Sequence, residues 1–197
     1  MPETRLLLAT TSAGKLAEWQ ALLADLPLRL LTLHDVGIDF DVDETGSTYA
    51  ANALLKVEAY GRASNELALA EDAGLSVAAL GGAPGVRSAR WEGSDYTHKN
   101  ALLVRLLDGK TGAERACAYR CVMVLRHPDG RTWQTTGECR GQIGTEPRGE
   151  DGFGYDPIFY IPRLRRTLAE VSIHEKDRIS HRGRAARALM QWLRQGP

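Results

Sequence analysis

The order of its strand-like and helix-like segments constrains the fold of this 197-residue chain most strongly. Apolar runs at 5–10 and 28–33 read as strands, and between them apolar residues recur at helical spacing over 13–26. Residues 115–126 and 131–143 alternate like the two strands of a long antiparallel hairpin. Strands that alternate with helices and then enter a hairpin predict an α/β fold with a mixed central sheet flanked by helices.

The remaining segments fit this arrangement. Aromatic and small apolar residues recur at helical spacing over 47–64, and leucines cluster helically over 95–107. The apolar stretch 68–80 predicts short strand pieces on either side of the polar pair Glu71-Asp72. Thr167-Leu168-Ala169-Glu170 fits a capping box, and a last helix is expected to begin near Ser180.

Composition limits the classes of protein that the chain can belong to. Hydrophobic residues make up 43%, and the length suits one domain over residues 1–197, so intrinsic disorder is excluded as the main description. The 25 basic and 25 acidic side chains balance, which argues against coating nucleic acid by bulk charge. The balance hides an acidic first half and a basic second half, which could supply metal-binding carboxylates and anion-binding cations to one site.

Cysteine usage and hydropathy indicate the compartment. Cys117, Cys121 and Cys139 form no C-x-x-C pair, so we interpret them as buried apolar thiols in a reducing environment. No stretch reaches the length of a membrane span, and residues 1–10 lack the features of a signal peptide. We therefore expect a cytoplasmic protein with no membrane partner.

A phosphate-binding turn is predicted where the first strand meets the first helix. Small residues there let the backbone approach an anion, a helix N-terminus offers N–H groups, and Lys15 adds a positive charge. A Walker A motif is excluded, because its first glycine would be Ala9 and its Ser/Thr would be Leu16. A plain strand-to-helix turn remains the alternative. The segment consists of Thr10, Thr11, Ser12, Ala13, Gly14 and Lys15.

Polar side chains interrupt two otherwise apolar regions. Asn52 and Lys56 lie four residues apart on one predicted helix face, which suggests a partly covered polar site, with an ordinary amphipathic helix as the alternative. Glu71 and Asp72 stand between apolar runs, where burial is costly unless a cation compensates the charge. Carboxylate oxygens without a Cys/His cluster indicate Mg²⁺ or Mn²⁺, and a turn with solvated acids is the alternative.

Two later segments carry groups suited to a nucleobase. Glycines on either side of Phe153 would leave its ring free to stack on a base. His181 and Arg182, at the start of the last helix, can donate hydrogen bonds in fixed directions to a carbonyl or phosphate oxygen. By itself, such a His-Arg pair is also typical of a helix end at the surface.

Taken in chain order, these segments resemble the inosine/xanthosine triphosphate pyrophosphatase family, whose members hydrolyse non-standard purine nucleoside triphosphates to the monophosphate and pyrophosphate. The resemblance extends from Leu6 to about Leu193. It is most specific in the stretches GGAPGVRSAR (81–90), GFGYDP (152–157) and ISHRG (179–183). It implies hydrolysis of ITP, dITP or XTP, a substrate cleft between two lobes, a homodimer, and Mg²⁺ as cofactor with Mn²⁺ as a substitute.

The resemblance also implies a role for individual residues. Residues 10–15 match the family's phosphate-binding turn, with Lys15 and Lys56 near the triphosphate. Glu44 and Asp72 match its metal-site carboxylates, and Asp72 also its proposed base. The matching substrate-binding residues are Ala73, Phe153 (the stacking ring), Gly154, Tyr155, Asp156, Lys176, His181 and Arg182.

Three positions depart from the family pattern. Ser12 stands where the family usually has Asn, Glu71 where it has Asp, and Ala73 where it has Ser. Ser12 still donates and accepts hydrogen bonds, Glu71 is one methylene longer, and Ala73 lacks the hydroxyl that the family offers to substrate.

Selectivity is expected at the edge of the base. Donors at His181 and Arg182 would pair with a 6-oxo group and be left unpaired by the 6-amino group of adenine, at about 1–3 kcal/mol each. This accounts for rejection of ATP and not of GTP. The alternatives are a pyrophosphatase for other modified or pyrimidine nucleotides, a catalytically weak nucleotide-binding regulator and, last, a nucleic-acid-binding module suggested by the basic last 35 residues.

Overall fold

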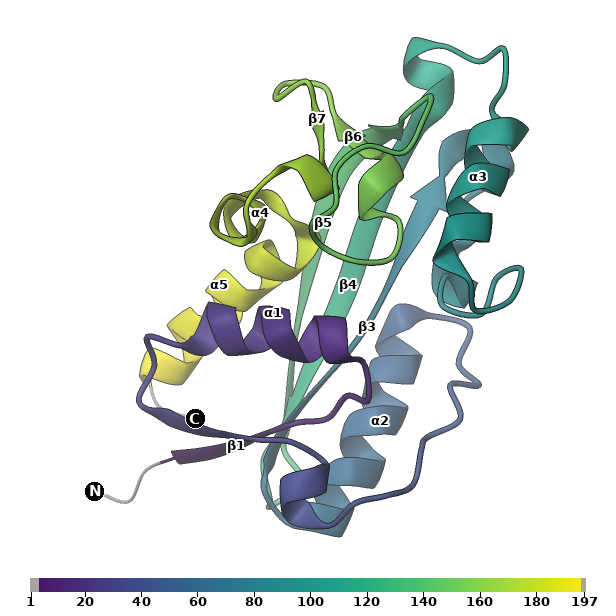
Figure 1. Cartoon of the computed structure of the whole chain (residues 1–197). Coiled ribbons are helices and arrows are strands. Elements are labelled where there is room, and N and C mark those ends of the chain that lie inside the picture. The colour runs from purple at the N-terminus through teal and green to yellow at the C-terminus, as the bar shows by residue number, and fades with distance from the viewer. Residues whose placement is uncertain (1–3, 196–197) are drawn as a thin grey trace. The chain divides into compact units, whose positions relative to one another are not determined.

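The computed structural model describes residues 4–195, which cluster into two compact units. The first unit comprises the chain up to Asp72, residues 121–137 and the segment from Arg184 onward. The second comprises 73–120 and 138–183. Strands β3, β4 and β5, each 11 or 12 residues long, contribute residues to both units, so each unit is assembled from segments that lie far apart in the sequence (Figure 1).

Seven strands form one mixed sheet in the order β2-β1-β3-β4-β5-β6-β7. β1 pairs in parallel with β2 and β3, whereas β6 pairs antiparallel with β5 and β7. The strand bounds are β1 Thr4–Leu8, β2 Leu28–Leu31, β3 Leu67–Val77, β4 Ala116–Arg126, β5 Thr132–Ile143, β6 Phe159–Ile161 and β7 Arg166–Thr167. The predicted mixed α/β sheet with a long hairpin is confirmed.

Five α-helices accompany the sheet in the described chain: α1 Ala13–Leu23, α2 Tyr49–Ser64, α3 Tyr96–Leu106, α4 Ile173–Ile179 and α5 His181–Gln195. Side chains cap several of their N-termini, as Ser12 does for α1 and Thr48 for α2. The capping box at Thr167 and Glu170 is confirmed, and it opens a short 3₁₀ turn at 168–170. None of the helices in the described part is long and apolar enough to span a membrane.

The core of the first unit forms where α2 packs on the parallel strands. Leu7, Ala68 and Ala70 from β1 and β3 meet Val57 and Tyr60 from α2, and all five are buried. Small residues on β3 let the helix approach closely, and the continuous apolar runs of β1 and β3 are typical of strands buried on both faces. This packing fixes the end of β1, which the predicted phosphate-binding turn follows, and the first half of β3, which leads to the carboxylates Glu71 and Asp72.

The second unit has a core of its own, made by the hairpin strands and α3. Leu75 and Leu103 are fully buried in it together with Tyr155, Phe159 and Leu168. The loop after β5 therefore contributes one aromatic anchor, Tyr155, from within the GFGYDP motif, and Phe159 follows at the start of β6.

The structure differs from the sequence predictions at two elements. Residues 67–77 form one continuous strand, because Glu71 and Asp72 are buried and partnered within β3 and do not interrupt it. Helix α4 was not predicted, because its seven residues IHEKDRI show no extended apolar stripe. Ser172 caps α4 through the backbone N–H of Glu175.

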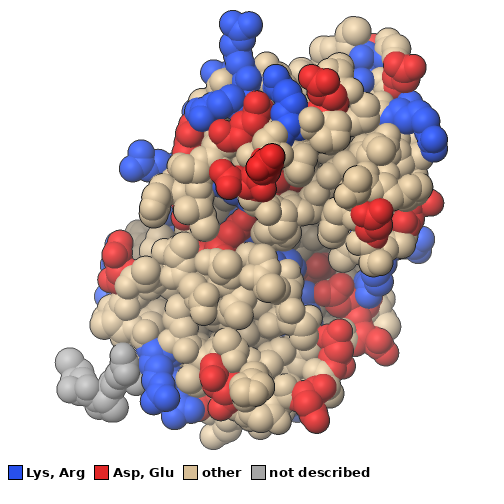
Figure 2. Space-filling view, in the orientation of Figure 1, with Lys and Arg blue, Asp and Glu red and all other residues tan. Residues whose placement is uncertain are grey.

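Acidic and basic side chains are intermingled on the face of the molecule shown in Figure 2. That face therefore gives no support to the alternative of a nucleic-acid-binding module, whose electrostatic footprint is a clustered basic region.

Candidate active site

The phosphate-binding turn lies in the first unit, directly after β1. Ser12 caps α1 by accepting a hydrogen bond from the N–H of Lys15 at 3.4 Å, and the hydroxyl of Thr10 accepts one from the N–H of Ser12 at 3.2 Å. Ser12, at the position where the resemblance implies Asn, therefore still organises the turn.

A cavity of about 420 Å³ opens beside this turn, within the first unit. Thr10 and Thr11 line it together with Phe40 and the carboxylates Asp39 and Asp41. Thr11 and Ala13 are exposed, and Gly14 is partly buried, so the start of α1 is accessible from solvent. The turn thus has the open N-terminal position that anion binding requires.

Three charged groups meet at the end of the first unit's part of β3. The ammonium of Lys56, on α2, lies 2.5 Å from a carboxylate oxygen of Glu44 and 4.0 Å from one of Asp72. Asn52, one turn before Lys56, donates to the other oxygen of Asp72 at 3.0 Å. Lys56 is buried, so the alternative of a solvated lysine on an ordinary amphipathic helix is wrong.

Asp72 has the character of a buried acid held by mixed charges. Burial is the main cause that raises the pKa of its carboxyl, and the neighbouring charge of Glu44 raises it further. Lys56, the hydrogen bond from Asn52 and Lys15 oppose this rise. A carboxylate in this position gains from any added cation.

The two adjacent carboxylates of β3 do not form one site. Successive side chains of a strand point to opposite faces of the sheet. Glu71 accordingly accepts a hydrogen bond from the indole of Trp19 at 3.0 Å and lies 3.4 Å from the ammonium of Lys15, on the α1 side. Asp72 contacts α2 instead. The longer side chain of Glu71 thus anchors α1 and Lys15. The two carboxylates that share Lys56 are those of Glu44 and Asp72.

The residues predicted to contact the base gather in the second unit. The Asp156 carboxylate accepts hydrogen bonds from the Lys176 ammonium at 2.6 Å and from the N–H of Phe153 at 2.8 Å. Both charged side chains are buried, and a Cβ at Gly152 would overlap the Asp156 carboxylate. A buried ion pair of this kind fixes the loop that carries Phe153.

The flanking glycines suggested that the ring of Phe153 stands free of its surroundings, and the structure shows that it does not. Its ring is partly buried, with the Lys176 ammonium 5.0 Å and the Arg182 guanidinium 5.6 Å from its centroid. Two cations within this range of an aromatic face are attracted to it. The ring therefore lies among the groups that were predicted to contact the base.

His181 and Arg182 are buried at the start of α5, so the alternative of a helix-end surface feature is wrong. The imidazole of His181 stacks on Tyr119 with ring centroids 4.7 Å apart and planes 17° apart. Gly183 follows, and a Cβ there would overlap the carbonyl of Asp177. This close approach explains why the ISHRG motif ends in glycine.

Of the remaining predicted positions, Ala73, Gly154 and Tyr155 belong to the second unit. Ala73 is partly buried in β3, and Tyr155 is buried and donates its hydroxyl to the carbonyl of Ser88 at 2.9 Å. Tyr155 is therefore a structural anchor of the loop.

Sequence reasoning did not assign several supporting residues. Trp19 holds Glu71, Tyr119 packs on His181, and buried Lys99 donates to the carbonyl of Ala89 at 2.7 Å, inside the GGAPGVRSAR loop. Burial lowers the pKa of Lys99. The partners of these residues lie beyond the spacing of one helix turn or strand repeat, so no local sequence pattern predicts the contacts.

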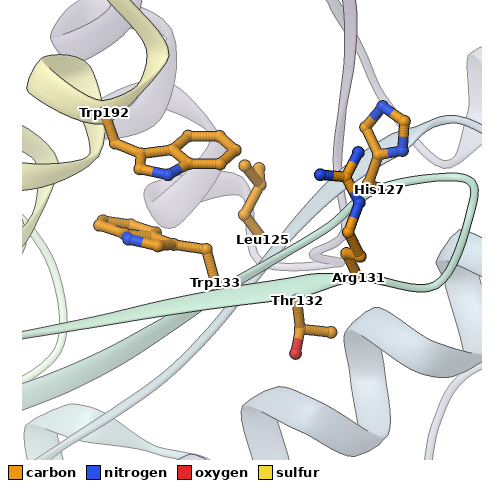
Figure 3. A pocket seen from close by; sticks show the side chains of 6 residues that line it. All are labelled: Leu125, His127, Arg131, Thr132, Trp133 and Trp192. Atoms are coloured by element: carbon orange, nitrogen blue, oxygen red, sulfur yellow. The ribbon is translucent and has the colours of Figure 1, made fainter. Parts of the chain in front are cut away.

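A second cavity, of about 170 Å³, lies in the first unit beside the end of the β4–β5 hairpin (Figure 3). Its wall includes Trp133 and Trp192, whose rings stack with centroids 5.4 Å apart. Arg131 and His127 lie at the other side of the cavity, and Arg131 is paired with Asp129. None of the predicted site residues lines it.

Comparison with known proteins finds relatives that match nearly the whole chain. A protein of Desulforamulus reducens named dITP/XTP pyrophosphatase is 42% identical over 191 residues, covering 96% of this chain and 95% of that protein. One of the same name from Thermus thermophilus is 43% identical over 194 residues, with 98% and 93% covered.

Two solved structures are also similar to this chain over nearly its whole length. A HAM1 protein from Coxiella burnetii superposes with a TM-score of 0.87 at 36% identity, covering 98% of this chain and all of that one. The Ham1 protein of Staphylococcus aureus superposes with a TM-score of 0.84 at 37% identity, covering 98% and 99%. Because the model of the Ham1 family matches residues 6–192, nearly the whole chain, this protein belongs to the Ham1 family.

Proposed function

We propose that this protein hydrolyses non-standard purine nucleoside triphosphates, namely ITP, dITP and XTP, to the monophosphate and pyrophosphate. Relatives named dITP/XTP pyrophosphatase that match over nearly their whole length support the substrate class. The observation that carries the proposal is the partly buried ring of Phe153 among the buried polar side chains of Asp156, Lys176, His181 and Arg182.

The two sets of residues divide the work on the substrate. In the first unit, residues 10–15 with Lys15 and Lys56 supply N–H groups and cations for the triphosphate. In the second unit, Phe153 stacks on the base while His181 and Arg182 donate to its 6-oxo edge.

Mg²⁺ is proposed as the cofactor, with Mn²⁺ as a substitute. The residues present fit it, because Mg²⁺ is commonly held by one or two carboxylates and completes its shell with water and substrate phosphates. Glu44 and Asp72 are such a pair, and they already share one cation, the ammonium of Lys56. When bound, the ion would neutralise charge on the triphosphate.

In the reaction, a water oxygen bonds to the α-phosphorus and the bond from that phosphorus to the α–β bridging oxygen breaks, so that pyrophosphate leaves. Asp72 orients the water and accepts its proton. A carboxylate bound directly to Mg²⁺ is a weaker base, so the roles of metal ligand and base compete at Asp72. Lys15 and Lys56 stabilise negative charge that grows during the attack.

Selection against adenine follows from the donors at the base edge. An adenine amino group would face His181 and Arg182 and leave buried donors unpaired, at about 1–3 kcal/mol each. Asp156, which is paired with Lys176, holds the backbone at Phe153. A homodimer and a cytoplasmic location are further proposals from family resemblance, and the three buried thiols fit a reducing compartment.

A substrate panel tests the proposal. Pyrophosphate release is measured from ITP, dITP, XTP, GTP, ATP and a pyrimidine triphosphate, with Mg²⁺ and with EDTA. Mg²⁺-dependent turnover of ITP and XTP with at least tenfold lower kcat/KM for ATP is expected. Preferred turnover of the pyrimidine substrate would favour the related pyrophosphatase activity, and tight ITP binding without turnover would favour the binding-only regulator.

A further inference from the structure

One buried side chain in the second unit contacts two parts of the base-recognition cluster at once. Tyr119 lies in β4, where its ring stacks on His181 at 4.7 Å and on Phe159 at 4.7 Å. Its hydroxyl accepts a hydrogen bond from the backbone N–H of Tyr155 at 3.1 Å. The same residue thus contacts a base-reading imidazole and the loop that carries the stacking ring.

The peptide between Gly154 and Tyr155 is held from both sides by side chains. Tyr119 accepts from its N–H, and Asn100 on α3 donates to its carbonyl at 3.1 Å. Gly154 has a φ of +69°, in the region that only glycine adopts freely, and the two side chains restrict the peptide that follows it. The other side of Phe153 is fixed by its N–H bond to Asp156.

The side chain of Asn100 is held in an unfavourable environment for one of its polar atoms. Its side-chain oxygen is buried and has no hydrogen-bond partner among the described residues. A buried polar atom without a partner is unfavourable, so the geometry at this position serves the amide's bond to the Gly154 carbonyl.

Resting on the proposed function, we propose that Tyr119 is a positioning residue for base recognition. Its hydroxyl fixes the Gly154–Tyr155 peptide and hence the direction of the Phe153 ring, and its ring face fixes the plane of the His181 imidazole. Tyr119 therefore holds Phe153, which stacks on the base, and His181, which contacts the base edge, in a fixed relative orientation. The substrate part involved is the purine ring, and the phosphate chain is unaffected.

The first test separates the hydroxyl from the ring. Tyr119→Phe keeps both stacking contacts and removes only the acceptor of the Tyr155 N–H. We expect KM for ITP to rise about tenfold with little change in kcat, and the kcat/KM ratio of ITP to ATP to fall. Tyr160→Phe is the control, because it removes a tyrosine hydroxyl from β6, outside the cluster.

Inorganic tripolyphosphate supplies the second readout, because it has the phosphate chain and no base. Its inhibition constant should be the same in the wild type and Tyr119→Phe. An unchanged KM and ITP:ATP ratio in Tyr119→Phe would overturn the proposal, and so would a parallel loss of tripolyphosphate and ITP binding, which indicates general loosening. A wild type that does not hydrolyse ITP would instead count against the proposed function.

Asn100→Ala gives an independent check on the shared peptide. It removes the bond to the Gly154 carbonyl and should raise KM for ITP in the same direction. Since both side chains hold one peptide, the double variant should lose less than the product of the two single effects. Strictly multiplicative effects would show that the two residues act separately and would contradict the coupling.

Discussion

At the scale of single residues, Asp72 carries the sharpest prediction. Asp72→Asn keeps the size of the side chain and removes the negative charge that orients water and attracts Mg²⁺, so kcat for ITP should fall at least about 100-fold. Asp43→Asn is the matched control, because Asp43 is an exposed carboxylate in the same loop as Glu44 and should leave kcat within about twofold. Near-normal turnover by Asp72→Asn would remove Asp72 from the mechanism.

The charge environment of Asp72 predicts a pH dependence. Its carboxyl must be ionised to act as a base, and burial raises its pKa, so activity should fall on acidification at a higher pH than the ordinary Asp value of 3.8 would give. Lys56 opposes the rise, so Lys56→Met should move the acid limb of kcat/KM to still higher pH. A pH-rate profile of both proteins measures this, and an acid limb that stays in place or moves down would contradict the assignment.

Local sequence identified the chemistry of these residues and not their partners. The family resemblance paired Glu44 with Asp72, and the structure brings both to Lys56. Strand alternation places Glu71 on the sheet face opposite to Asp72, toward Trp19. We predicted a polar break at Glu71-Asp72 and not one continuous strand, so this orientation was missed. Pairings over 52 residues of sequence, as between Trp19 and Glu71, have no local signal.

At the scale of elements, the junction of α4 and α5 positions His181 and Arg182. The backbone at Gly183 lies against the carbonyl of Asp177, so Gly183→Ala should force the two helices apart. We expect a loss of about 1–3 kcal/mol in the free energy of unfolding and a raised KM for ITP. Gln191→Ala, an exposed change on α5, is the control in thermal unfolding and kinetics. A variant with unchanged stability and KM would show that the contact is unimportant.

A second element-scale prediction concerns the tie between α2 and β4. Glu58 on α2 accepts from Arg62 at 2.9 Å and from Arg126 of β4 at 3.2 Å, and these bonds lower its pKa. Its contribution to stability is therefore present above the unfolded value of 4.5 and is lost as pH falls through the lower folded value. Because Glu58 is partly exposed, the contribution is expected to be about 1 kcal/mol or less.

Glu58→Gln tests this tie by thermal unfolding at several pH values. The variant should melt below the wild type at pH 7, and the difference should shrink as the pH falls below 4. A difference that stays constant with pH would mean that the lost charge is not its cause.

Element boundaries were predicted to within a few residues where apolar periodicity was strong, as for 49–64 and 132–143. Helix α4 was missed because a seven-residue helix has too few turns to show a period. Its cap at Ser172, and Ser180 between α4 and α5, are signals that could have revealed it.

At the scale of the whole molecule, the sequence predicted the α/β sheet and its hairpin, and the comparisons place the chain in the Ham1 family. The division into a unit with the predicted phosphate-binding residues and one with the predicted base-binding residues could not be predicted from spacing. It arises because β3, β4 and β5 are long enough to contribute to both units. The substrate cleft between two lobes and the homodimer stay predictions.

The proposed reaction splits ITP at its α-phosphorus. Hydrolysis of ITP in ¹⁸O-labelled water, followed by mass analysis of the products, tests where the bond breaks. We expect IMP carrying one ¹⁸O atom and unlabelled pyrophosphate, and at least about 100-fold slower formation of both with Asp72→Asn. Label in the pyrophosphate, or IDP and phosphate as products, would contradict it.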